Sequence, residues 1–380
     1  MQTHTNHAIV SEGPRHASLA ALTVSHSGRW IATCADDFGF TINIRDTSEG
    51  RVIREWPSDM TDSLGSYPFL ISFSPDESRL ILGGYQSGNI DVWDSFGGVR
   101  LTTLSNGHSK RATCGRWLLD KVRLATIDDG GQVCLWDMEA YRLLSIFSKP
   151  ASSETFLTQV KPEECLAISS DSSHILSRAR TSVSVWGVAS GVLRTTIIGQ
   201  GRKSNDTQVL SAVFNSEGTT VITLSSDALV CRWMINTGEL LDETKLVDES
   251  GSACPGVGAE STLSPDGSRV CWTTKDGVKG MAHLSETKGG SLIWSQVHHH
   301  RLEIRGVVFS PDGDYVATTS RSLPMLLWRV RDGKQMARNT DPTKAPAINA
   351  FSSGGELLVM GGWDGTVTTF RMGEVVEEEW

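Results

Sequence analysis

The sequence of 380 residues lacks several features that mark particular classes of protein. It has no run of 18 or more apolar residues, so no membrane-spanning helix is expected. Residues 1–15 lack the apolar core of a secretory signal peptide. Charged residues make up 21% of the chain and hydrophobic residues 39%, and this composition excludes an intrinsically disordered protein.

The cysteines show no pattern of pairing or metal binding. There are seven, an odd number, and none has CxxC spacing. Cys34, Cys134, Cys231 and Cys271 stand inside apolar runs, where a cysteine behaves as a small hydrophobic residue. We therefore predict buried free thiols and a reducing compartment, the cytoplasm or the nucleus, for a protein that is not secreted.

Basic charge and catalytic motifs are scarce too. The net charge is −9, so clustered cations for a phosphate backbone are few, and neither a nucleic-acid nor a membrane partner is expected. The chain contains no GxxxxGK[ST], GxSxG, HExxH or CxxCH motif. His298–His300 is the one histidine cluster, and in an extended segment only two of its side chains would share a face, too few for zinc. We expect no cofactor, no metal and no enzymatic activity.

What the sequence does contain is an internal repeat. Eight apolar residues precede turn-like segments, and each is followed 18 to 21 residues later by a second anchor. The first anchors are Val24, Phe73, Trp117, Ile168, Phe214, Leu263, Phe309 and Phe351. The second anchors are Arg45, Trp93, Trp136, Trp186, Trp233, His283, Trp328 and Phe370. Successive second anchors are 42 to 50 residues apart, so one rigid unit recurs with linkers of variable length.

Each unit has the sequence character of antiparallel strands. Turns such as Ser310-Pro311-Asp312-Gly313 separate runs rich in Val, Thr and Tyr. The next run alternates polar and apolar residues with period two, and a glycine-containing turn leads to a further apolar strand. We therefore predict four short strands in each unit and little helix.

The repeat resembles the WD40 family. A Trp-Asp pair closes a strand at Trp93-Asp94 and at Trp136-Asp137, and a Gly-His pair lies upstream at Gly107-His108. The resemblance covers residues 19–380 and implies an all-β propeller of eight four-stranded antiparallel blades, with seven blades as the alternative. We expect one domain, 1–380, with a segment at 1–18 that could act as a clasp. The expected repeats are 19–56, 67–104, 112–147, 163–199, 208–246, 259–297, 304–338 and 346–380.

The resemblance also implies a hydrogen-bonded tetrad in unit three. It would join His108, Thr126, either Asp128 or Asp129 with Asp129 as the first choice, and Trp136. Such a group fixes the loop between blades, so we interpret it as structural. A strand from the N-terminus, around His7–Val10, or one from the C-terminus, Glu374–Trp380, would close the ring.

The predicted function follows from the fold class. Propellers bind through displayed loops, so we expect a non-enzymatic scaffold or adaptor, a monomeric ring that binds protein or peptide partners at its loop face and central opening. Its turns carry residue types that are frequent at binding hot spots, and the first candidates are Tyr85, Arg178, Arg180, Arg321 and Trp363. The alternative is a receptor for a phosphopeptide, a glycan or a small acidic ligand at this arginine-bearing rim. A propeller enzyme is the third class.

Overall fold

The computed structural model describes twelve segments of the chain. They are residues 9–11, 18–36, 40–57, 70–84, 87–147, 165–198, 207–276, 279–297, 304–320, 325–338, 346–362 and 364–372. These segments form strands and turns, and they contain no α-helix. None of them could cross a membrane as a helix.

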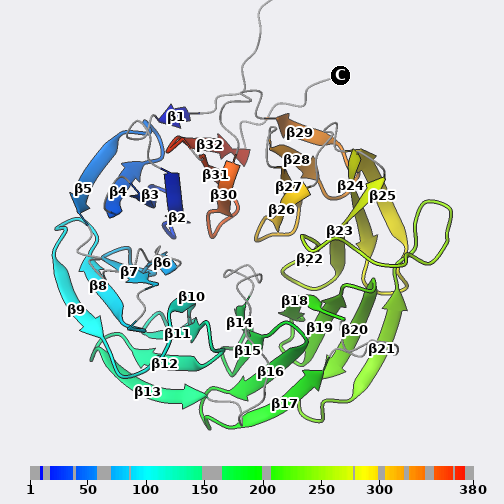
Figure 1. Ribbon diagram of the computed structural model, residues 1–380, viewed down its shortest axis with the longest axis horizontal. Helices are drawn as coiled ribbons and strands as arrows, with labels where there is room; N and C mark the ends of the chain where they lie inside the picture. The colour runs from blue at the N-terminus through cyan, green and yellow to red at the C-terminus, as the bar shows by residue number, and fades with distance from the viewer. Residues whose placement is uncertain are drawn as a thin grey trace, which may run out of the picture.

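The described strands form eight four-stranded antiparallel sheets arranged as the blades of a propeller (Figure 1). The eight-blade prediction is therefore confirmed. Blade one contains β2 (Ser18–Val24), β3 (Trp30–Asp36), β4 (Phe40–Asp46) and β5 (Val52–Pro57), and blade two contains β6 (Leu70–Phe73), β7 (Arg79–Gly83), β8 (Ile90–Asp94) and β9 (Arg100–Leu104). Blade three contains β10 (Ala112–Trp117), β11 (Arg123–Asp128), β12 (Val133–Asp137) and β13 (Arg142–Phe147). Blade four contains β14 (Leu166–Ile168), β15 (His174–Arg178), β16 (Ser182–Gly187) and β17 (Leu193–Ile198).

Blades five to eight continue in the same order around the ring, from the inner strand to the outer one. Blade five contains β18 (Val209–Phe214), β19 (Thr220–Ser225), β20 (Leu229–Met234) and β21 (Leu240–Lys245), and blade six contains β22 (Thr262–Leu263), β23 (Arg269–Asp276), β24 (Lys279–Glu286) and β25 (Leu292–Val297). Blade seven contains β26 (Ile304–Phe309), β27 (Tyr315–Ser320), β28 (Leu326–Arg329) and β29 (Gln335–Arg338). Blade eight contains β30 (Pro346–Phe351), β31 (Leu357–Gly362), β32 (Val367–Arg371) and β1 (Ile9–Ser11).

The core is divided among the interfaces between blades. Eight clusters of buried apolar residues occur, and each combines side chains from two neighbouring blades. The cluster between blades eight and one contains Val359 and Val367 of the former, and Leu19, Leu22 and Ile31 of the latter. Because each blade buries its faces only against its neighbours, stability adds up around the ring, as in other repeat proteins.

The N-terminal strand closes the ring. β1 pairs antiparallel with β32, with Ile9 opposite Thr369 and Ser11 opposite Val367. This strand is the outermost of blade eight, whose other three strands come from the C-terminal part of the chain (Figure 1). The N-terminal alternative for closure is thus the one observed; residues 374–380 lie outside the described segments.

A hydrogen bond from a tryptophan fastens the middle strands of several blades. The indole Nε1 of Trp136 donates to Thr126 Oγ1 at 2.8 Å, that of Trp233 to Thr223 Oγ1 at 2.9 Å, and that of Trp328 to Thr318 Oγ1 at 2.9 Å. Trp186 donates to Ser177 Oγ at 3.3 Å. In each case the tryptophan lies on the third strand and the hydroxyl on the second.

Blade six differs from the prediction at its second anchor. Val270 pairs with Ser285, as Val221 pairs with Trp233 in blade five, so Ser285 is the anchor and His283 is not. The prediction was wrong because the hairpin of β23 and β24, eight residues in each strand, is longer than that of the neighbouring blade. The longer hairpin moves the anchor two residues along the chain.

Blade six has the equivalent hydrogen bond, but its tryptophan lies on the second strand and its hydroxyl on the third. Trp272, on the second strand, donates through Nε1 to Ser285 Oγ on the third strand at 2.9 Å. His283 stacks on Trp272 with ring centroids 4.0 Å apart, and its nitrogens lie 2.8 Å from Thr274 Oγ1 and 2.5 Å from Ser295 Oγ. Burial lowers the pKa of His283 to about 4, despite the opposing effect of Glu249 and Asp248.

A common turn joins the first and second strands of several blades. In blade seven Ser310 Oγ donates to Asp312 Oδ1 at 2.5 Å and accepts from the backbone N–H of Tyr315 at 3.0 Å. The same serine–aspartate bond occurs at Ser74–Asp76, Ser169–Asp171 and Ser264–Asp266. Gly313 has φ +75°, a conformation that a side chain disfavours, which explains the Ser-Pro-Asp-Gly pattern.

The seven cysteines are buried and none of them forms a disulfide, as predicted. Burial raises the pKa of the Cys134 and Cys231 thiols to about 12 in each case. Both thiols therefore stay protonated at neutral pH and behave as apolar core residues.

Deletion of residues 1–12 is expected to lower the melting temperature by at least about 5 °C, because β32 would lose its only outer neighbour. Differential scanning calorimetry would measure the shift. Deletion of residues 1–6 leaves β1 in place and serves as the control. An equal melting temperature for the two deletions would contradict the role of β1 in closure.

Replacement of Ser285 by alanine is expected to destabilise the protein by roughly 1–3 kcal/mol, because the Trp272 N–H would stay buried without its acceptor. Urea unfolding followed by fluorescence would measure the loss. Ser291→Ala, which removes an exposed hydroxyl in the following turn, should cost less than about 0.5 kcal/mol. Equal losses for the two variants would contradict the exchanged hydrogen bond.

Candidate binding site in the central channel

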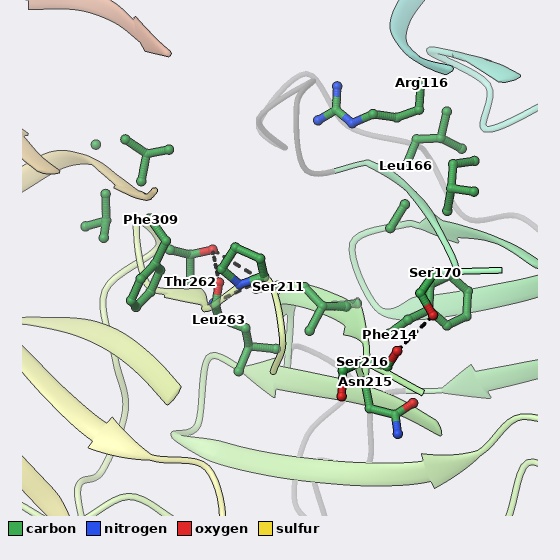
Figure 2. A pocket seen from close by; sticks show the side chains of 18 of the residues that line it. Arg116, Leu166, Ser170, Ser211, Phe214, Asn215, Ser216, Thr262, Leu263 and Phe309 are labelled. Carbon is green, nitrogen blue, oxygen red and sulfur yellow. Dashed lines mark hydrogen bonds between the residues drawn. The ribbon is translucent and has the colours of Figure 1, made fainter. Parts of the chain in front are cut away.

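The first strands of the eight blades surround the axis of the ring (Figure 1). A cavity of about 750 Å³ lies along this axis and is lined by residues of the first strands of blades three to eight (Figure 2). The residue just before the first anchor faces it in five successive blades. These residues are Arg116, Ala167, Val213, Thr262 and Val308. The repeat therefore places one side chain per blade at the same level of the channel.

The lining is mainly neutral. Phe214, Leu263 and Phe309 contribute apolar surface, and serine, threonine and asparagine side chains contribute hydrogen-bonding groups. Among the described residues that line the cavity, Arg116 is the one cation and Glu260 the one carboxylate. Such a surface suits an uncharged ligand or segment that offers apolar side chains and a few polar groups.

Hydroxyl groups of the lining connect neighbouring blades. Ser211 Oγ lies 3.3 Å from Thr262 Oγ1 and accepts from the backbone N–H of Leu263 at 3.3 Å (Figure 2). Ser170 Oγ donates to the backbone carbonyl of Ser216 at 2.8 Å. These bonds hold the channel wall in one shape, so the cavity is formed before any ligand arrives.

Of the five residues predicted for partner binding, the structure describes two, Arg178 and Arg180. Tyr85, Arg321 and Trp363 lie outside the described segments. Arg178 is only 3% exposed, and its Nη1 donates to the backbone carbonyl of Val209 at 2.8 Å. Arg178 was expected in a turn of the rim, but it is the last residue of β15 and its side chain is buried.

Arg180 also forms contacts with the start of blade five. Its backbone carbonyl accepts from the N–H of Val209 at 2.7 Å. Its Nη2 lies 2.9 Å from the side-chain oxygen of Gln208 when that amide is oriented toward it. The two arginines of blade four therefore connect its turn to the start of blade five, and Arg180 is partly exposed.

The tetrad of blade three is assembled around Thr126. His108 Nε2 lies 2.7 Å from Thr126 Oγ1, which also accepts from Trp136. Asp128 Oδ2 lies 3.3 Å from His108 Nδ1, without the alignment of a hydrogen bond. Asp129 instead pairs with Arg111 at 2.7 Å, so choosing Asp129 as the fourth member was wrong.

The local turn explains which carboxylate turns inward. Asp128 Oδ1 accepts from the backbone N–H groups of Gly130 at 2.8 Å and Gln132 at 3.0 Å, which pins its side chain over the turn. Asp129 follows one residue later and so points to the other side of the chain. The tetrad is almost fully buried, because the side chains of His108 and Asp128 are 0% and 1% exposed. It is therefore a structural group without access to substrate.

Comparison with known proteins agrees with this architecture. The family model of the WD40 repeat, described as "WD domain, G-beta repeat", matches residues 290–322. The match runs from β25 of blade six through β26 and β27 of blade seven. The chain is an eight-bladed β-propeller in which residues 290–322 match the WD40 repeat.

Solved structures share the fold of this WD40 propeller. The crystal structure of a computationally designed protein, Ika8, superposes with a TM-score of 0.68 and 20% sequence identity, covering 95% of this chain and 98% of that one. This likeness shows the fold alone. No curated protein matches the sequence.

Sequence inspection missed the residues that line the channel of the WD40 propeller. The signal was present one place before each first anchor, where seven residues are small or β-branched and Arg116 is the exception. No group of three or more described histidine, cysteine or acidic residues could hold a metal ion. His298–His300 lies outside the described segments.

Alanine replacements of the two neighbouring aspartates should separate their roles. Asp128→Ala is expected to cost roughly 2–3 kcal/mol, because two backbone N–H groups and His108 lose a buried carboxylate. Asp129→Ala removes a partly exposed ion pair and should cost less than about 1 kcal/mol. Urea midpoints would rank the variants, and the reverse order would contradict the tetrad as described.

Proposed function

We propose that this WD40 propeller is a non-enzymatic scaffold that holds an extended segment of a partner protein in its central channel. WD40 propellers are in general protein-interaction scaffolds. The observation that carries the proposal is the cavity of about 750 Å³ on the axis, lined by successive blades. Its size falls within the range of roughly 300–1,000 Å³ that is usual for ligand sites.

The chemistry of the lining supports a peptide as the ligand. An extended peptide presents side chains in alternation, and apolar side chains can pack on Phe214 and Phe309. Its backbone amides can exchange hydrogen bonds with hydroxyl and amide groups such as Ser216, Asn215 and Asn349. A wall already fixed by blade packing loses little entropy when it binds, which favours affinity.

The described arginines of the rim do not favour an acidic ligand there. Arg178 is buried, and Arg180 is engaged with Gln208 and Val209. No described residue of that rim favours such a ligand over a peptide in the channel.

A channel-filling substitution tests the proposal. Peptides selected from a random displayed library should bind the wild-type chain, and Val308→Trp should weaken binding at least tenfold, because the indole would occupy the cavity. Isothermal titration calorimetry with selected peptides would measure the affinities.

The matched control is Val192→Trp, which adds the same bulk at a residue 55% exposed on the outer edge of blade four. It should leave the affinity unchanged. Peptides that bind both variants equally would place the site outside the channel, and failure to select any peptide would overturn the proposed function.

A further inference from the structure

One group of turns at the channel is strongly acidic. The turns between first and second strands in blades four to seven, residues 169–173, 215–219, 264–268 and 310–314, carry five exposed carboxylates and no lysine, arginine or histidine. We call this group the acidic crescent. Its members are Asp171, Glu217, Asp266, Asp312 and Asp314.

Three of the four turns of the acidic crescent border the cavity. Ser170, Ser216 and Pro265 line the cavity, and each is the immediate neighbour of a crescent residue. Figure 2 shows Ser170 beside Ser216 at the wall, joined by their hydrogen bond. One end of the channel therefore opens among carboxylates, whereas the wall inside it is mainly neutral.

The charge of this group is unevenly distributed around the ring. The corresponding turns of blades eight, one, two and three, residues 352–356, 25–29, 74–78 and 118–122, carry four carboxylates and two lysine or arginine side chains. The crescent turns thus hold a formal charge of −5 and the others −2. The cations Arg29 and Lys121 belong to the second set, outside the blades that supply most of the cavity wall.

Two carboxylates of the crescent, Asp171 and Asp266, have lowered pKa values. Hydrogen bonds from Ser169 and from the backbone and side chain of Ser173 lower the pKa of Asp171 to about 2. Burial acts to raise the pKa of Asp266, but hydrogen bonds from Ser264 and Ser268 outweigh it and the net shift is downward. These two side chains therefore carry negative charge at the channel mouth throughout the neutral range.

We propose that the partner segment is basic, with lysine or arginine residues that lie on the acidic crescent and an adjoining uncharged stretch that fills the channel. This inference rests on the proposed function. Charge complementarity carries it, because a cationic flank meets the carboxylates at the mouth while the neutral lining accepts the rest. A protein of net charge −9 would attract such a segment from solution, and salt would weaken the attraction.

The test uses two displayed peptide libraries that share a random stretch of six uncharged residues. One library carries an Arg-Lys-Arg flank and the other a Ser-Gly-Ser flank. At low salt the wild-type chain should recover the basic-flank library at least tenfold better. Raising the salt to about 0.5 M should reduce this preference several-fold, because the screening length falls to a few ångströms.

Substitutions locate the preference on the crescent. Glu217→Gln with Asp314→Asn removes two exposed carboxylates that make no side-chain hydrogen bond within the described structure, so the turns stay intact. This double variant should lose at least threefold of the preference. The control, Glu139→Gln with Glu239→Gln, makes the same change in net charge in turns between third and fourth strands and should retain it.

The outcomes separate this inference from the proposed function. One outcome would be that both libraries bind equally well and that Val308→Trp abolishes the binding of both. In that case the crescent inference fails, whereas the channel remains the binding site. An equal effect of the control variant would assign the preference to net charge and overturn the crescent. If neither library binds, the proposed function fails as well.

Discussion

The structure depends on the burial of each blade face against a neighbouring blade. Every one of the eight apolar clusters spans two blades, so no blade has a complete core of its own. A ring satisfies this requirement for all blades at once, whereas an open row would leave two faces exposed to water. The pairing of β1 with β32 completes blade eight with a strand from the N-terminal part of the chain, and so links the two ends of the chain within one blade.

Closure also creates the candidate site. Eight first strands held around one axis leave a channel, and hydrogen bonds such as that of Ser170 with the Ser216 carbonyl connect neighbouring blades at its wall. The wall is mainly neutral and one mouth is acidic, so a single surface offers both shape and charge for recognition. These properties arise from turns and strand ends contributed by different blades, and no single repeat contains them.

Repetition allowed much of the fold to be predicted. The near-constant spacing between anchors reflects a fixed hairpin geometry, which is why the blade number and four-stranded sheets followed from it. Blade six shows the limit of this method. Its longer hairpin places Ser285, and not His283, at the second-anchor position. The indole–hydroxyl hydrogen bond is still formed, with Trp272 on the second strand and Ser285 on the third. A sequence pattern requires a tryptophan at one position of the repeat. The folded blade requires only that an indole N–H and a hydroxyl lie opposite each other on neighbouring strands.

The sequence by itself determined the eightfold repeat, the strand character of each unit and the buried thiols, because these depend on local periodicity and composition. The tertiary structure alone decided which terminus closes the ring, that Asp128 and not Asp129 faces His108, and that Arg178 points inward. It also decided which residues line the channel and which carboxylates stand at its mouth. Those outcomes depend on contacts between residues far apart in the chain, and neither spacing nor residue type records such contacts.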